Sequence, residues 1–171
     1  LADVQGAAGA AARRALGELR EQIDAAADAV REVAHGLSPR ILSEQGLGPA
    51  LEELAAGLPV ETEVNWAGRA GAGAPSPSDE ASEDLYLIAS EAITNAMKHS
   101  ECSRIEVDVA RRDDVVQLTV RDDGAGGAAP TGRGILSMAA RARRLGGTFE
   151  LVSPDGGPTT VTVRIPSGGP R

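Results

Sequence analysis

The chain has 171 residues and a formal net charge of −8, and its basic residues form no obvious cluster. This acidic balance argues against DNA or RNA as the main partner. Cys102 is the single cysteine, which excludes an internal disulfide bond and indicates a reducing compartment, so we expect a cytoplasmic segment. There is no signal peptide and no apolar run of about 18 residues that would predict a membrane contact by this segment. Because the chain begins at Leu1 rather than methionine, we expect a fragment, and a membrane anchor elsewhere in the full-length protein stays open.

The first 40 residues predict a long helix that needs a partner. Between about residues 8 and 37, apolar residues recur at steps of three and four, and charged residues fill the other positions. This stripe is thin and rich in alanine, so a single helix cannot bury it, and a second helix or a dimer partner is implied. We expect Pro39 to end the helix. The recurring apolar residues are Leu16, Leu19, Ile23, Ala26, Val30, Val33 and Leu37.

Beyond Pro39, the hydrophobic pattern predicts an α/β domain. We expect a helix at about 47–56, a strand at 60–66, a loop rich in Gly, Pro and Ser at 67–78, and a helix from 79 to about 99 that Ser78 or Asp79 caps. Alternating residues predict two strands near 105–109 and 116–120 that pair as a hairpin. A glycine-rich loop at 124–134, a helix from 134 to about 145, and two strands near 149–151 and 161–165 complete the chain. This order predicts a two-layer α/β sandwich, with a mixed sheet and helices on one face.

One face of the helix that ends near residue 99 carries an unusual polar stripe. Glu91, Asn95, Lys98 and His99 follow at spacings of four, three and one, so they project from one side of a helix. Glu91 and Lys98 taken alone would be ordinary surface charges, whereas Asn95 is a mediocre helix former with no local reason to be there. Asn95 offers a neutral oxygen to Mg²⁺, while Lys98 and His99 offer positive charge to phosphate.

Two glycine motifs follow at the positions where a nucleotide would need them. Asp122 ends a predicted strand and is able to accept a hydrogen bond from the exocyclic amine of adenine, and Gly124 and Gly126 follow it directly. Gly132 and Gly134 lead into a helix, whose first backbone N–H groups favour phosphate. Each motif alone is weak evidence, since an Asp-x-Gly segment is usually a plain turn. Together with the polar stripe, they predict a site for ATP and Mg²⁺.

In this order, the three segments resemble the N box, the D-x-G-x-G box and the second glycine box of the GHKL ATPases, which have the Bergerat fold. Among these, the chain is most similar to sensor histidine kinases of the DesK/NarX-like subfamily. Three further segments carry the likeness: the junction at 36–42 and 46–51, the helix at 134–138 with Arg141 and 145–147, and the closing strand at 159–166. The resemblance covers nearly the whole chain from about residue 16.

The resemblance implies a role for each residue of the site. It makes Asn95 the Mg²⁺ ligand and a catalytic residue, with Glu91 as a second catalytic residue at the metal–phosphate end. It makes Asp122 the adenine reader and has Thr159 support the base through water. The remaining cofactor-binding residues implied are Lys98, His99, Gly124, Gly126, Gly132 and Gly134, and the last two bound a short ATP lid at about 127–131.

The resemblance also implies a domain organisation and partners. Residues 1–40 would be part of a dimerisation and phosphotransfer domain, and residues 41–171 the GHKL ATP-binding catalytic domain. The implied reaction transfers the γ-phosphoryl group of ATP to a histidine for relay to a response regulator, and the full-length protein would be a homodimer through the N-terminal helix. The chain's two histidines, His35 and His99, do not match the subfamily's acceptor motif, so we expect the acceptor to lie outside this chain.

Two residues depart from the family's pattern, and two alternative functions stay open. Pro158 precedes Thr159 where the family usually has glycine, which reduces backbone freedom beside the adenine. Asp123 stands where Asn is frequent, and we expect it to add charge near the lid. The same fold would also serve an anti-sigma-factor-type serine kinase. A non-catalytic dimerisation module with a decayed ATP site is the alternative from a different class.

Overall fold

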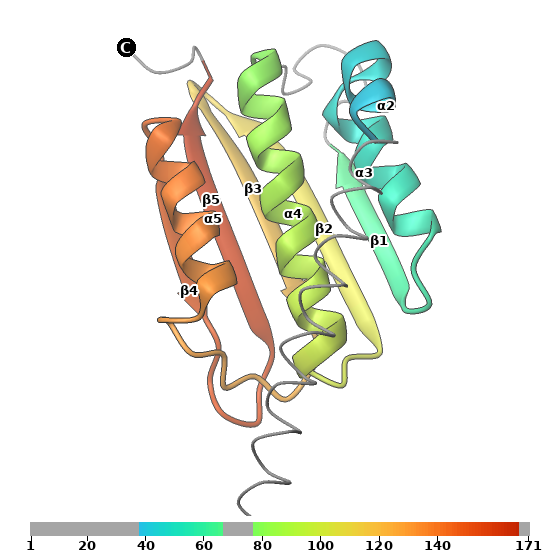
Figure 1. Ribbon diagram of the computed structural model, residues 1–171, viewed down its shortest axis with the longest axis vertical. Coiled ribbons are helices and arrows are strands. Elements are labelled where there is room, and N and C mark those ends of the chain that lie inside the picture. The colour runs from blue at the N-terminus through green and yellow to red at the C-terminus, as the bar shows by residue number, and fades with distance from the viewer. Residues whose placement is uncertain (1–37, 67–76, 168–171) are drawn as a thin grey trace, which may run out of the picture. The chain divides into compact units, whose positions relative to one another are not determined.

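The computed structural model describes residues 38–66 and 77–167 (Figure 1). The long helix expected at 8–37, most of the expected 67–78 loop and His35 lie outside the described residues. Residues Arg40–Arg171 form one compact unit, to which all of the following refers except the first two residues of the helix at Ser38–Gln45. In the described ranges, no helix combines the length and the apolar character that crossing a membrane requires.

The sheet has five strands and is mixed, as predicted. The strand order is β1-β2-β3-β5-β4, in which β1 pairs parallel with β2 and every other neighbouring pair is antiparallel. The predicted hairpin is the β2–β3 pair. The strands span Glu61–Trp66 (β1), Arg104–Arg112 (β2), Val115–Asp122 (β3), Thr148–Val152 (β4) and Thr159–Pro166 (β5).

The helices α3 (Leu47–Ala56), α4 (Asp79–His99) and α5 (Arg133–Arg144) lie on one face of the sheet, with α4 in the middle (Figure 1). This arrangement confirms the predicted two-layer α/β sandwich. Ser78 caps α4, since its hydroxyl oxygen accepts a hydrogen bond from Ala81 N at 3.3 Å. The core lies between α4 and the inward face of the strands, and residues such as Leu85, Ile88 and Leu118 are fully buried there.

The stretch around Pro39 contains a helix that the sequence analysis did not predict. We expected Pro39 to end the helix at about 8–37, which lies outside the described residues. The structure has a helix, α2, over Ser38–Gln45, with Pro39 as its second residue. A proline in the first helical turn costs little, because the N–H group that it lacks has no partner within the helix at that position. The helix α2 ends before Gly46, whose φ of 86° favours glycine.

The register of the strands places Asp122 at one end of the core. Asp122 is the last residue of β3 and pairs with Ile105 of β2 on one side and with Thr159 of β5 on the other. Because side chains alternate along a strand, Asp122 shares the inward face with Leu118 and Val120. A carboxylate therefore follows two apolar residues at the end of a buried strand face.

Candidate functional site

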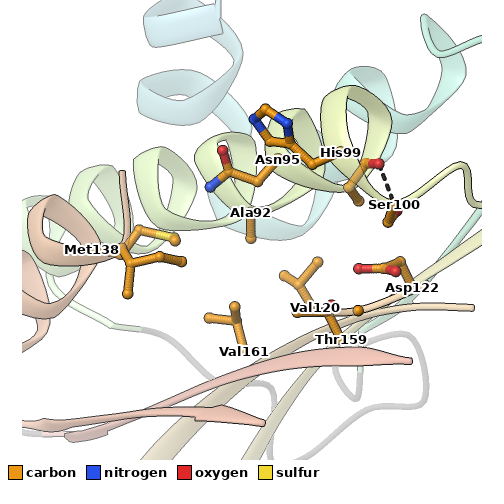
Figure 2. A pocket seen from close by; sticks show the side chains of 12 residues that line it. Ala92, Asn95, His99, Ser100, Val120, Asp122, Met138, Thr159 and Val161 are labelled. Atoms are coloured by element: carbon orange, nitrogen blue, oxygen red, sulfur yellow. Dashed lines mark hydrogen bonds between the residues drawn. The ribbon is translucent and has the colours of Figure 1, made fainter. Parts of the chain in front are cut away.

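A pocket that is partly open to solvent lies between α4, the inward face of the sheet and α5. Ala92 points from α4 toward the strands, whereas Asn95 and His99 lie on the outer side of the helix (Figure 2). The lining residues are Ala92, Asn95, Ala96, His99, Ser100, Val120, Asp122, Gly126, Ile135, Met138, Thr159 and Val161.

Asp122 is the buried carboxylate of this pocket, with 5% of its surface exposed. Its Oδ1 atom accepts a hydrogen bond from Gly124 N at 2.9 Å, which fixes the orientation of the carboxylate. Val120 and Val161 provide an apolar floor beside it (Figure 2). A carboxylate that is oriented by its own loop and lies beside an apolar floor suits a flat heterocycle carrying an amino group.

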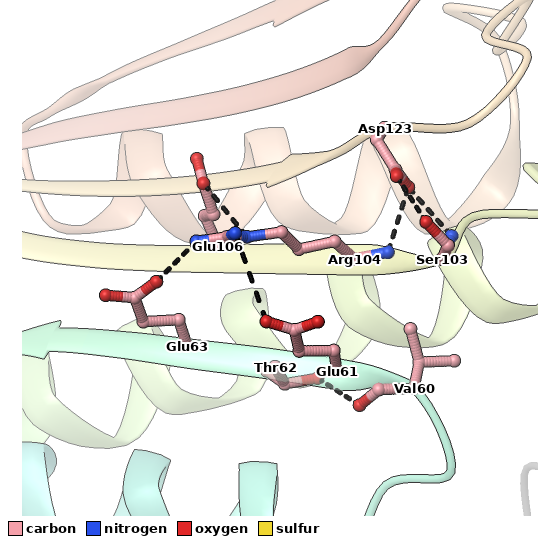
Figure 3. A network of polar contacts seen from close by, with 8 residues as sticks. All are labelled: Val60, Glu61, Thr62, Glu63, Ser103, Arg104, Glu106 and Asp123. Atoms are coloured by element: carbon pink, nitrogen blue, oxygen red, sulfur yellow. Dashed lines mark hydrogen bonds and ion pairs between the residues drawn. The ribbon is translucent and has the colours of Figure 1, made fainter.

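Asp123 points to a different part of the molecule from the one we expected. Its carboxylate accepts hydrogen bonds from Ser103 N at 2.8 Å, Ser103 Oγ at 2.6 Å and Arg104 N at 2.9 Å (Figure 3). The hydrogen bond from the Ser103 hydroxyl, with the two backbone N–H groups, lowers the pKa of Asp123 to about 2. The charge thus stabilises the start of β2, and the expectation that it acts near the lid is wrong.

Gly124 and Gly126 are required by close packing between three loops. A Cβ atom at Gly124 would overlap Ser100 just after α4, with the Ser100 Oγ at 2.6 Å, and one at Gly126 would overlap the backbone oxygen of Pro154. Gly126 also has a φ of 66°, in the region that favours glycine. Ala125 sits between them and is held on both sides, donating to Ser100 O at 2.9 Å and accepting from Gly156 N at 2.7 Å.

The start of α5 abuts the polar stripe of α4. A Cβ atom at Gly134 would overlap the Glu91 carboxylate and lie 3.2 Å from Asn95 Nδ2. The structure therefore brings together Glu91, Asn95 and Gly134, although only Asn95 of these lines the pocket. Glu91 and Asn95 are half-buried, whereas Lys98 and His99 are exposed at the last turn of α4.

The residues of the expected lid, 127–131, are anchored by the turn between β4 and β5. Ala128 N donates a hydrogen bond to Ser153 Oγ at 3.0 Å, and this oxygen lies 2.9 Å from Thr159 Oγ1. Gly132 follows the lid and donates to Ala129 O at 3.0 Å. Thr159 lines the pocket, so the lid and the pocket share a pair of hydroxyl groups.

A buried ion pair holds α5 against α4. Asp84 is fully buried and accepts from Arg141 Nη1 and from Arg144 Nε, both at 3.0 Å, and from Arg144 Nη2. The hydrogen bond to Asp84 raises the pKa of Arg144 above its ordinary value. Because α5 begins at the lid, this pair fixes the orientation of the helix whose first turn faces Glu91 and Asn95.

A second charged cluster lies on the sheet and not in the pocket. Arg104 donates a 2.6 Å hydrogen bond to Glu63, and its Nε atom lies 3.2 Å from Glu106 Oε1 without hydrogen-bond alignment (Figure 3). Glu61 lies 3.9 Å from Arg104 as well. In the part of the chain that the structure describes, no three His, Cys, Asp or Glu residues come together as a metal site.

The pocket contains about half of the residues that the sequence singled out. Asn95, His99, Asp122, Gly126 and Thr159 line it. Gly124 and Gly134 support it through the close approaches above, whereas Glu91, Lys98 and Gly132 lie outside the lining. Sequence reasoning missed Ser100 and Ser153, and it named Ile135 and Met138 only as part of a motif. The i, i+4 spacing of Ala92, Ala96 and Ser100 was the available signal for Ser100.

Comparison with known proteins gives one family. The family described as "Histidine kinase-, DNA gyrase B-, and HSP90-like ATPase" matches residues 80–169, which is just over half of the chain. The nitrate/nitrite sensor protein NarX of Escherichia coli K12 is 35% identical over 161 residues, covering 88% of this chain and 26% of NarX. The sensor histidine kinase MctS of Rhizobium johnstonii is 28% identical over 158 residues, covering 88% of this chain and 34% of MctS. The chain thus spans about a quarter to a third of the length of these relatives.

Solved structures agree on the fold. The histidine kinase domain of the blue-light-activated kinase EL346 of Erythrobacter litoralis superposes with a TM-score of 0.58 at 21% identity, covering 71% of this chain and 65% of that domain. The ATP-binding domain of PrrB from Mycobacterium tuberculosis gives a TM-score of 0.53 at 22% identity, covering 73% of this chain and 92% of that domain. The α/β fold expected from the sequence is the fold of these ATPase domains.

Proposed function

The chain belongs to the histidine kinase-, DNA gyrase B- and HSP90-like ATPase family, and from this membership we propose that it is the ATP-binding catalytic part of a sensor histidine kinase. In this proposal, the γ-phosphoryl group of ATP passes to a histidine outside this chain. The homology to NarX and MctS favours a histidine kinase over a serine kinase of the same fold.

The observation that carries the proposal is the position of the Asp122 carboxylate in the pocket and its hydrogen bond. One carboxylate oxygen is already bound by Gly124 N, and the side chain lies in the pocket beside Val120 and Val161. We assign the other oxygen to the exocyclic amine of adenine. Thr159 pairs with Asp122 across β3 and β5, and this register supports our assignment of its hydroxyl group to the same base, through water.

We assign the phosphates to the part of the pocket that Asn95 and His99 line. The first turn of α5 at Gly134 approaches Asn95. The N–H groups of a helix N-terminus and a nearby cation favour phosphate, so Gly132, Gly134, His99 and the neighbouring Lys98 are assigned to it.

Asn95 fits Mg²⁺, because a hard cation takes neutral oxygen ligands and completes its shell with phosphate oxygens and water. Bound Mg²⁺ would neutralise charge on the phosphates. The chain's own contribution to phosphoryl transfer is then mainly positioning, in which Glu91 supports the metal–phosphate end from the same helix face.

Further parts of the proposal concern the full-length protein. We propose that residues 1–40 belong to a dimerisation and phosphotransfer domain, and that residues 41–171 are the catalytic domain. The histidine acceptor would lie on a helix outside this chain, and a response regulator would receive the phosphoryl group. We propose the cytoplasm as the compartment of this reaction, because the reaction uses ATP and a response regulator.

The adenine assignment is tested by the Asp122→Asn variant. The introduced carboxamide keeps an oxygen for Gly124 N and presents an NH₂ group to the adenine amine, so two donors would oppose each other. We expect ATP affinity in calorimetry to fall about 30- to 100-fold, equivalent to about 2–3 kcal/mol. A 6-oxopurine nucleotide, which has an acceptor in place of the amine, should lose less affinity or gain some. The neighbouring Asp123→Asn variant is the control, and unchanged ATP affinity in Asp122→Asn would refute the assignment.

The reaction is tested by supplying the acceptor. Purified chain incubated with γ-labelled ATP and Mg²⁺ should form no phosphohistidine by itself, whereas a separate histidine-bearing helix of the same subfamily should become labelled. The Asn95→Ala variant should keep most of its nucleotide affinity and lose the Mg²⁺-dependent transfer. Acid-labile phosphohistidine on the chain alone would contradict the expected absence of an acceptor. ATP binding without transfer to any supplied histidine would favour the non-catalytic module.

A further inference from the structure

We propose that Ser153 is a positioning residue that holds the ATP lid in register with the base end of the pocket. The inference rests on the proposed function, because it assigns residues 127–131 to a lid over ATP. Ser153 directly follows β4 and is half-buried. It contacts the lid on one side and a pocket-lining hydroxyl group on the other.

The hydrogen bonds of Ser153 define this position. Its Oγ atom accepts from Ala128 N at 3.0 Å and lies 2.9 Å from Thr159 Oγ1. A serine hydroxyl has one hydrogen and two lone pairs, so after accepting from Ala128 it is still able to donate to Thr159 or to accept from it. One oxygen atom therefore serves both the lid backbone and the hydroxyl group that we assign to the base.

The surrounding turn makes the anchor rigid. Gly156 N donates to Ala125 O at 2.7 Å, and Gly126 lies directly against Pro154 O. The backbone before the lid is thus held by the same β4–β5 turn that carries Ser153. The Ser153 hydroxyl group then fixes the part of the lid that this turn does not hold, which is the position of Ala128.

The position of the lid matters because the lid leads directly into α5. Gly132 follows the lid, and α5 begins at Arg133, so a shift at Ala128 displaces the first-turn N–H groups that we assign to phosphate. The carboxylate of Asp122 has its own anchor in Gly124 N. Loss of the Ser153 hydroxyl group should therefore weaken binding of the phosphates more than binding of the base.

The experiment compares ATP with adenosine, which lacks the phosphates, in the wild-type chain and in the Ser153→Ala and Ser153→Thr variants. Calorimetry on Ser153→Ala should show ATP affinity reduced about three- to tenfold, as for loss of one hydrogen bond, and adenosine affinity reduced by no more than about twofold. Hydrogen exchange at the Ala128 amide should be faster. Ser153→Thr keeps the hydroxyl group and should restore all three values.

Several outcomes would overturn the inference. An equal loss of ATP and adenosine affinity would indicate a general loosening of the fold, as would failure of Ser153→Thr to restore ATP binding. Unchanged ATP affinity and unchanged Ala128 exchange in Ser153→Ala would show that the hydroxyl group positions nothing. Wild-type chain that binds neither ligand would refute the proposed function itself, and with it this inference, a result distinct from the others.

Discussion

Replacing Asp84 with alanine tests how α5 is held in place. The Asp84 carboxylate is fully buried and accepts three hydrogen bonds, one from Arg141 and two from Arg144. Asp84→Ala removes the acceptor for all of them. We expect the free energy of unfolding to fall, because the packing of α5 on α4 loses its polar anchor.

The exposure of the two arginines determines how large the effect is. Removing one partner of a fully buried ion pair costs about 3–5 kcal/mol, because the other charge stays buried without compensation. Here the side chains of Arg141 and Arg144 are 34% and 58% exposed, so water solvates both guanidinium groups once Asp84 is gone. We therefore expect a smaller loss, about 2 kcal/mol, which lowers the Tm of a unit of this size by about 6–10 °C.

The assay is urea and thermal denaturation followed by circular dichroism, with Glu83→Ala as the matched control. Glu83 is the exposed carboxylate next to Asp84 on α4, and its removal should change stability by less than about 0.5 kcal/mol. If Asp84→Ala also stays within about 0.5 kcal/mol of the wild type, the three hydrogen bonds contribute nothing net. If Glu83→Ala lowers the free energy of unfolding as much as Asp84→Ala does, the loss comes from removing negative charge from α4 in general and not from the ion pair.

Two further substitutions have defined outcomes. Gly134→Ala would push a methyl group into the Glu91 carboxylate, so we expect ATP-dependent phosphoryl transfer to fall at least about tenfold. The control is Gly57→Ala, because the nearest atom to a Cβ added there is 3.7 Å away. Asp123→Ala should lower stability at about pH 6, and this deficit should shrink as the pH falls from about 4 toward 2. The pKa of Asp123 is depressed from 3.8 to about 2, so its stabilising effect is complete above the ordinary pKa and is lost as the carboxylate is protonated. A deficit in urea midpoint that is equal at about pH 6 and about pH 2 would contradict this explanation.

The sequence predicted the elements whose signal is local. Alternation predicted the strand β3 that Asp122 ends, and the apolar period with the Ser78 cap predicted α4. The short helix α2 was missed because Pro39 signals a helix end and a first helical turn equally well. The direction of the Asp123 side chain was also missed, since its donors lie about 20 residues earlier in the chain.

Contacts between segments far apart in the chain limited how much of the site the sequence could predict. The position of β5 between β3 and β4 brings Thr159 beside Asp122, and no local pattern in the sequence encodes that order. The same holds for Ser153 and Ala128, which are 25 residues apart. Serine after a strand is an ordinary turn residue, so its role becomes visible only when the lid lies against it.

The packing of the glycines determines how variants of this site should be interpreted. Gly124 lies against Ser100, and Gly126 lies against Pro154, so each joins two loops without contributing a functional group. A side chain at either position would separate these loops and move Asp122, and nucleotide binding would fall although no ligand contact was removed. Loss of binding therefore does not identify a contact residue here. A change in preference between adenine and a 6-oxopurine does, because it follows from the donor and acceptor pattern of Asp122 and not from the spacing of the loops.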